Sequence, residues 1–224
     1  MLKNSTIIYY TAQQEQPEFE QKVIDQINLV KGDLPVISVS QKPLDFGDNI
    51  CVGNVGRTYL NAFRQLLIGC DKATTKFIFT AESDCFYPPG YFEFRPLDET
   101  KIYSHVNTWV LWKAGNDKYY HKEQTHGGMI YGREFLIKFF NECFKGLPTW
   151  SREKVGFPFY KKDQEFVYFS TLPIVSMKTG DGIQKGTRVS SVVSPVRNLE
   201  YWGNARELKD RIWTHSNLSQ TVGI

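Results

Sequence analysis

The sequence predicts a single α/β domain over residues 1–224, with a mixed, mostly parallel central sheet flanked by helices. Two β-favouring apolar runs, at 6–11 and 34–39, enclose a segment at 17–30 whose apolar side chains recur at helical spacing. A strand, a helix and a strand in this order form a right-handed crossover between parallel strands. Hydrophobic residues make up 41% of the 224 residues, which provides one sizeable core and argues against disorder.

The rest of the chain continues this alternation of helices and strands. Buried strands are expected at 77–80 and 172–177, and a strand with one exposed face at 102–112. Apolar stripes predict helices at 56–69, 134–144 and 204–213, and a helical segment within 157–169. Residues 41–54, rich in Pro, Gly, Asp and Asn, are expected to form a loop.

Charge, cysteine content and hydropathy exclude several classes of protein. A net charge of +3 and a pI near 8.5 permit an anionic partner, but a protein that coats DNA would be more basic. The four cysteines form no C-x-x-C pair, so we expect no zinc or redox site. The start of the sequence is too short and too quickly polar for a signal sequence, so we expect reduced thiols in a cytoplasmic compartment. No apolar run approaches the roughly 20 residues needed for a transmembrane segment.

Two carboxylates at the end of the strand 77–80 form the main candidate site. Glu82 and Asp84, separated by Ser83, follow this strand directly and precede a Pro-Pro-Gly turn. Ligands of open α/β sheets bind at the carboxyl ends of strands. Carboxylates held there can bind Mg²⁺ or Mn²⁺, and such an ion can clamp a diphosphate. The alternative is an acidic loop in which Asp84 caps the turn.

Two further segments could contact a nucleotide. The end of the first strand, at Tyr10, Thr11 and Ala12, could hold a nucleotide base, although no G-x-G-x-x-G motif follows it. Arg57 is expected in the first turn of the helix 56–69, where positive charge is unfavourable, so it could face a phosphate. A solvated arginine is the alternative.

Glycine-containing segments later in the chain supply more candidates. Gly127 and Gly128 would let the backbone approach a ligand closely, and His126 before them could line a pocket or serve a structural role. A polar, glycine-rich loop carries Lys185 and Arg188, which could contact phosphates or simply be solvated.

The order of these elements resembles the GT-A glycosyltransferases, nucleotide-sugar-dependent enzymes built on one Rossmann-like domain. The resemblance covers most of the chain but matches no single protein closely. The D-x-D motif of that family stands here as Glu82-Ser83-Asp84, with Glu in place of the first Asp. The helix at 56–69 is similar to the family element that precedes this motif.

The resemblance implies roles for particular residues. Asp84 would bind Mn²⁺ or Mg²⁺ together with His215 from the C-terminal region, and Glu82 would touch the ribose or a metal-bound water. Residues 126–128 would line the pocket for the donor sugar and the acceptor. Asp163 would act as the catalytic base of an inverting reaction, although its alternative role is an N-cap.

The implied activity is sugar transfer from a nucleoside diphosphate sugar, foremost a UDP-sugar, to an acceptor hydroxyl. The acceptor would be a saccharide or a hydroxymethylated pyrimidine in DNA, as in phage enzymes related to the base J transferase. A DNA acceptor could use a set of aromatic and basic residues, which could equally pack in the sheet: Trp109, Trp112, Lys118, Tyr119, Tyr120 and Lys122.

Two other classes stay open at this point. A sugar-nucleotide nucleotidyltransferase would carry a glycine-rich, basic phosphate loop after the first strand, whereas residues 12–15 read Ala-Gln-Gln-Glu. A carbohydrate- or nucleic-acid-binding module could keep the fold without turnover, which the glutamate at position 82 leaves open.

Overall fold

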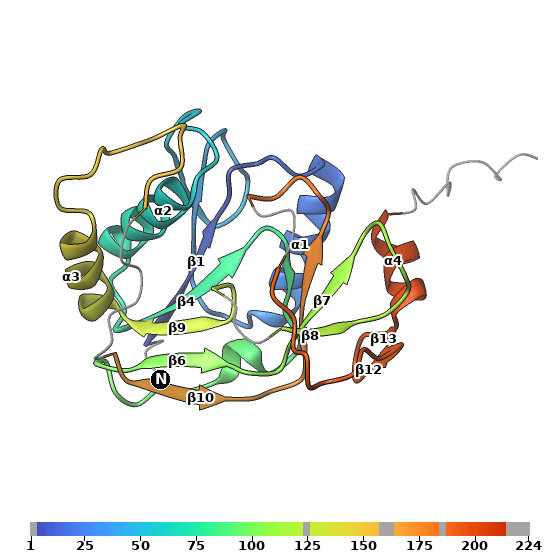
Figure 1. The fold of residues 1–224 in the computed structure, drawn as a ribbon. Helices are drawn as coiled ribbons and strands as arrows, with labels where there is room; N and C mark the ends of the chain where they lie inside the picture. The colour runs from blue at the N-terminus through green and yellow to red at the C-terminus, as the bar shows by residue number, and fades with distance from the viewer. Residues whose placement is uncertain (1–3, 123–125, 157–163, 184–186, 214–224) are drawn as a thin grey trace, which may run out of the picture.

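A computed structural model describes residues 4–122, 126–156, 164–183 and 187–213. Its main sheet has seven strands, of which four consecutive ones are parallel and one is antiparallel to both its neighbours (Figure 1). The predicted α/β class, with a mixed and largely parallel sheet, is therefore confirmed. In spatial order the strands are β10 (Phe166–Phe169), β6 (Ile102–His105), β9 (Met129–Gly132), β4 (Phe77–Glu82), β1 (Ser5–Tyr10), β2 (Val36–Ser40) and β3 (Asp48–Cys51).

Helices cover both faces of this sheet. Helix α1 (Pro17–Val30) packs on one face, and α2 (Tyr59–Lys72) and α3 (Arg133–Cys143) pack on the other (Figure 1). Alternate side chains of a strand point to opposite faces. Ile7 accordingly joins the core cluster that contains α1, whereas Ile8 joins the cluster that contains α2 and α3.

The chain changes direction in the sheet between β1 and β4. Helix α1 leads from β1 to β2 on one side, and α2 leads from β3 back to β4 on the other side of β1. Strands β1 and β4 are parallel neighbours, so their carboxyl ends lie together at a topological switch point. In open α/β sheets this is the position at which ligands bind.

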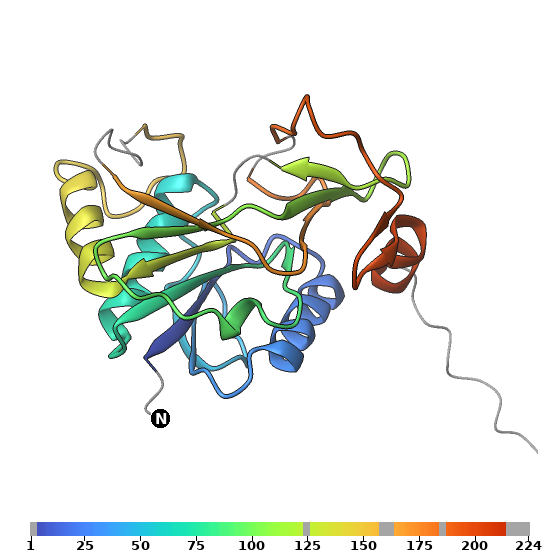
Figure 2. The ribbon, with the colours of Figure 1, turned by 90° about the horizontal axis from the view of Figure 1, so that it is seen from below.

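A second, smaller sheet lies beside the first, with α4 (Ala205–Trp213) next to it (Figure 2). Its strands, in spatial order, are β5 (Cys85–Phe86), β11 (Ile174–Lys178), β7 (Thr108–Trp112) and β8 (Tyr120–Lys122). Short elements complete the described fold: the 3-10 turn Tyr91–Glu93 and the hairpin of β12 (Asn198–Leu199) and β13 (Gly203–Asn204). Strand β5 follows β4 after two residues, so the acidic motif lies where the two sheets meet.

The structure corrects three expectations about individual elements. The single strand predicted at 102–112 is two strands, because the chain leaves the main sheet after His105 and enters the second sheet at Thr108. Residues 166–169, expected within a helical segment, form β10, which pairs with the strand β6. The predicted loop 41–54 contains β3, whose four residues, Asp-Asn-Ile-Cys, are too few and too mixed in polarity to give a strand pattern.

Other expectations hold. Helix α1 spans the predicted residues 17–30, and the remaining helices begin and end within three residues of their predicted limits. All four cysteines are free thiols, and three of them are buried. Among the described residues, none of the helices combines the length and the apolar character needed to span a bilayer.

Candidate functional site

A cleft of about 740 Å³ opens at the carboxyl ends of β1 and β4. Its described walls come from the loop after β1, the start of α2, the acidic motif and the segment after β11. The sequence-predicted residues among its lining are Tyr10, Thr11, Ala12, Arg57, Glu82, Ser83, Asp84, His126 and Arg188. The topological switch point thus brings nine of the predicted site residues to one cleft.

Two of the other predicted residues are described and are absent from this lining. Gly127 and Gly128 are buried and are not part of the described lining. Asp163, Lys185 and His215 lie outside the described residues, so the roles suggested for them remain predictions.

Two tyrosines hold Glu82, one through its side chain and one through its backbone amide. Tyr10 is the direct partner of Glu82 in the β1–β4 register, and its hydroxyl donates to Glu82 Oε1 at 2.8 Å. The buried Tyr87 hydroxyl accepts from the Glu82 amide at 3.0 Å and donates to the Gly127 carbonyl at 2.7 Å. These bonds fix the direction in which Glu82 leaves β4.

Gly127 is a glycine because the space beside it is taken. A Cβ at this position would lie 2.9 Å from both Cys85 Sγ and Glu82 Oε2. The glycine therefore permits close packing behind the acidic motif. The expected contact of this segment with the donor sugar stays a prediction.

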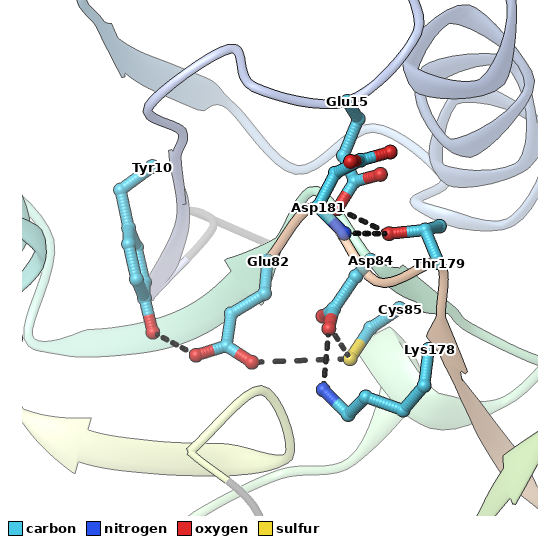
Figure 3. A network of polar contacts seen from close by, with 8 residues as sticks. All are labelled: Tyr10, Glu15, Glu82, Asp84, Cys85, Lys178, Thr179 and Asp181. Atoms are coloured by element: carbon cyan, nitrogen blue, oxygen red, sulfur yellow. Dashed lines mark hydrogen bonds and ion pairs between the residues drawn. The ribbon is translucent and has the colours of Figure 1, made fainter. Parts of the chain in front are cut away.

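Asp84 forms an ion pair with Lys178, a residue that the sequence analysis did not single out (Figure 3). The Met177 amide donates to the Asp84 carbonyl at 2.6 Å, so the pairing of β11 with the β5 region delivers the next residue to the acidic motif. Lys178 Nζ lies 2.7 Å from Asp84 Oδ2, and the two side chains are 13% and 17% exposed.

The pair is charged at neutral pH. Burial alone would raise the pKa of Asp84, but the charge and hydrogen bond of Lys178 outweigh it and lower that pKa. Burial alone would lower the pKa of Lys178, but Asp84 raises it well above its ordinary value. Burial, followed by the charge of Asp84, raises the pKa of Glu82, which favours its protonated form.

The described donor atoms fit a divalent cation poorly. Ligand atoms of Glu82, Asp84 and Cys85 lie within 4.8 Å of one another, close enough to share an ion. Asp84, however, is engaged by an ammonium, and Glu82 accepts the Tyr10 hydroxyl and has a raised pKa. The Cys85 thiol points to Asp84 Oδ1 at 3.4 Å. Burial raises the pKa of this thiol further, so it is protonated. It is also a soft ligand, whereas Mg²⁺ and Mn²⁺ prefer oxygen ligands.

The segment after β11 is tied to two other walls of the cleft, and Figure 3 shows the first of these ties, to Glu15. The Thr179 hydroxyl donates to Glu15 Oε1 at 3.0 Å and accepts from the Asp181 amide at 3.1 Å. The Arg57 guanidinium donates to the Asp181 carbonyl. Arg57 precedes the helix instead of lying in its first turn, because Thr58 is the N-cap and its hydroxyl accepts from the Asn61 amide.

His126 contributes a neutral ring to the cleft. Burial, helped by the charge of Lys122, lowers the pKa of His126 to about 4. The imidazole packs edge-on against Phe63, with ring centroids 5.3 Å apart. His126 is thus uncharged near pH 7 and does not add to the positive charge of the site.

Basic side chains outnumber acidic ones in the described lining. The acidic residues are Glu15, Glu82 and Asp84, and the basic residues are Arg57, Lys122, Lys154, Lys178 and Arg188. This excess of positive charge favours an anionic ligand. Lys178 lies at the end of a predicted strand, so the sheet-edge argument that selected Asp84 could also have selected it.

The aromatic residues considered for a DNA acceptor are only partly available. Tyr119 is fully buried, so its suggested stacking on a base is wrong. Trp109 is half-buried and donates its indole N–H to Asn107 Oδ1 at 2.8 Å. Trp112 and Tyr120 contact each other edge-to-face, with ring centroids 5.1 Å apart.

Comparison with solved structures finds likenesses in fold at very low sequence identity. S. aureus TarS 1-349 in complex with UDP-GlcNAc matches with a TM-score of 0.46 and 10% identity over 86% of this chain and 62% of that chain. The inositol-1-phosphate CTP transferase from T. maritima matches with a TM-score of 0.44 and 10% identity over 79% of this chain and 89% of that chain. A third is the mannose-1-phosphate geranyltransferase from Thermus thermophilus, with a TM-score of 0.43 and 7% identity over 79% and 75% of the two chains.

The chain spans between 30% and 62% of the length of the TarS structures that it matches. A scan against models of protein families and a search of curated protein sequences found no match.

Replacing Glu15 with glutamine is expected to stabilise the protein at pH 8 but not at pH 4. Burial raises the pKa of Glu15 to about 6, against the opposing Thr179 hydrogen bond, and the charge of Asp84 adds to the rise. Because the folded protein binds this proton more tightly than the unfolded chain, ionised Glu15 costs stability above about pH 6. We expect a gain of about 1 kcal/mol after allowance for solvent screening, measured by urea unfolding. The matched change of the exposed Glu153 should have no such pH dependence; equal stability of wild type and Glu15→Gln at pH 8 would contradict the prediction.

Proposed function

We propose that this protein transfers a sugar from a nucleoside diphosphate sugar to an acceptor hydroxyl. The observation that carries the proposal is the place of Glu82-Ser83-Asp84 at the carboxyl end of β4, facing a cleft with an excess of basic side chains. A nucleoside diphosphate has an uncharged base and a strongly anionic diphosphate, and the cleft offers both kinds of surroundings.

The chemistry of the lining residues suggests where the base, the diphosphate and the sugar of the donor would lie in the cleft. Tyr10, Thr11 and Ala12 at the end of β1 would lie along the base, foremost a uracil, and the ribose. The diphosphate would lie near Lys178, with Arg57 and Arg188 as further cations. The sugar would then extend toward His126, whose neutral imidazole can hydrogen-bond to a hydroxyl.

The transfer step exchanges one bond at the anomeric carbon for another. The bond from that carbon to the diphosphate oxygen breaks, and its electron pair leaves with the diphosphate, where cations stabilise the growing charge. The acceptor oxygen forms the new bond, and its proton passes to a carboxylate base. Asp163 remains the candidate base of an inverting reaction, and no step is assigned to a divalent ion.

The acceptor is a saccharide or a hydroxymethylated pyrimidine in DNA. Both offer a hydroxyl, and Lys122 in the cleft wall could serve a phosphate backbone. Incubation with a labelled donor and each acceptor class distinguishes the two.

A nucleotidyltransferase is the second candidate, and the loop after β1 disfavours it. That loop places Glu15 in the cleft wall and ties it to Thr179, where an enzyme that binds a nucleoside triphosphate would need backbone amides and cations. A binding module without turnover would bind the nucleotide sugar but release no nucleoside diphosphate from it.

The first test is a thermal-shift screen with UDP, GDP, CDP and their sugars, each with EDTA and with Mn²⁺. A ligand that binds only the folded state raises the Tm. At a ligand concentration one hundred times the Kd, the free energy of unfolding rises by roughly 2.7 kcal/mol. We expect one nucleotide, foremost UDP, to raise the Tm. We also expect the corresponding nucleotide sugar to be turned over slowly. If none of these ligands raises the Tm under either condition, the proposal is wrong.

A further inference from the structure

Lys178 places a fixed positive charge at the acidic motif. Its ammonium lies 2.7 Å from Asp84 Oδ2, and both residues line the cleft. Asp84 is the hydrogen-bond partner of this ammonium among the described residues. An ammonium has three donors, so it can bind Asp84 and still donate to oxygens of a ligand.

The backbone around Lys178 holds it firmly at this position. Strand β11 is paired on both sides, with β7 and with β5. The Lys178 carbonyl accepts from the Lys113 amide at 2.9 Å, and the preceding amide bonds to the Asp84 carbonyl. A lysine on a flexible loop would lose side-chain and backbone conformational entropy on binding a phosphate. Lys178 is already ordered before binding, so it loses less.

We infer that Lys178 is the resident cation of this site and binds the diphosphate of the donor in the place that a divalent metal would otherwise take. The inference rests on the proposed glycosyltransferase function. A divalent ion and the ammonium would compete for the Asp84 carboxylate and would repel each other at that short distance. Donor binding and transfer therefore need no added metal.

Removal of the ammonium should create a metal dependence. Without Lys178, the carboxylate of Asp84 is left beside Glu82, and the two can then be bridged by a hard cation. Lys178→Met keeps the length of the side chain and removes its charge, and Lys178→Arg keeps the charge. The matched control is Lys209→Met, since Lys209 is also buried (10% exposed) and paired, with Asp117 at 3.2 Å, but does not line the cleft.

The experiment measures UDP, GDP and CDP binding by calorimetry for wild type and the three variants, in EDTA and in Mn²⁺. We expect the wild type to bind one nucleotide in EDTA, with less than a threefold change in Kd on addition of Mn²⁺. Lys178→Met should bind it at least tenfold more weakly in EDTA and recover part of this loss in Mn²⁺. Lys209→Met should bind like the wild type, and Lys178→Arg should lie closer to the wild type than Lys178→Met.

A second readout needs no nucleotide. Electron paramagnetic resonance of Mn²⁺ should show binding to Lys178→Met and much weaker binding to the wild type. Nucleotide binding by the wild type in Mn²⁺ but not in EDTA overturns the inference and leaves the proposed function standing. Absence of nucleotide binding under both conditions overturns the proposed function. Should Lys178→Met fail to fold, the wild-type comparison and Lys178→Arg still decide the question.

Discussion

Replacing Asp84 with alanine is expected to lower the free energy of unfolding by about 3 kcal/mol at pH 7. The change leaves the ammonium of Lys178, 13% exposed, without its carboxylate partner. Both Asp84 and Lys178 contribute to the free energy of unfolding at this pH. A lowered pKa makes the Asp84 contribution present at neutral pH and lost in acid, and a raised pKa makes the Lys178 contribution present until strongly alkaline pH.

A double-mutant cycle separates the pair from its surroundings. Lys178→Met alone should also destabilise, because it leaves Asp84 buried beside Glu82, whereas the double variant Asp84→Ala/Lys178→Met should regain much of the loss. Urea unfolding in EDTA measures all four proteins, so that no metal replaces the missing ammonium. If the stability losses of the two single variants simply add in the double variant, the ion pair is not coupled in solution.

Replacing Gly132 with alanine is expected to cost about 3 kcal/mol of folding stability. Gly132 ends β9 and caps α3, and the backbone of the segment before β6 crosses directly over it. A Cβ at this position would lie 1.9 Å from the carbonyl oxygen of Glu99 and 2.6 Å from its carbonyl carbon. Both are backbone atoms, so relief requires movement of the chain and not of a flexible side chain.

Gly156→Ala is the matched control for that change. A Cβ at Gly156 would meet no atom of the described residues within 4 Å, and its backbone conformation is one that alanine adopts. Its stability should stay within about 0.5 kcal/mol of the wild type or rise slightly, because alanine restricts the unfolded chain. Urea unfolding of both variants tests the contrast; similar midpoints for Gly132→Ala and the wild type would mean that the segment at Glu99 yields easily.

The elements that could be predicted from the sequence are those with strong local patterns. The helix 17–30 has a complete apolar stripe and a proline at its first position, and the structure matches it residue for residue. The strand 166–169 could not be predicted from its local pattern. Its exposed Val167 and Tyr168 show no alternation, and its pairing with β6 depends on residues about sixty positions earlier in the chain.

The candidate site divides in the same way. By itself, the sequence determined the α/β class, the strand that leads to Glu82 and Asp84, and the end of the first strand as a second candidate segment, because periodicity and composition act over a few residues. The tertiary structure alone decided that Lys178, 94 residues from Asp84, meets it, and that Gly127 packs behind the motif instead of lining the cleft. The physical reason is that strand pairing and burial between distant segments set these contacts, and no local pattern encodes which distant charge will be the partner.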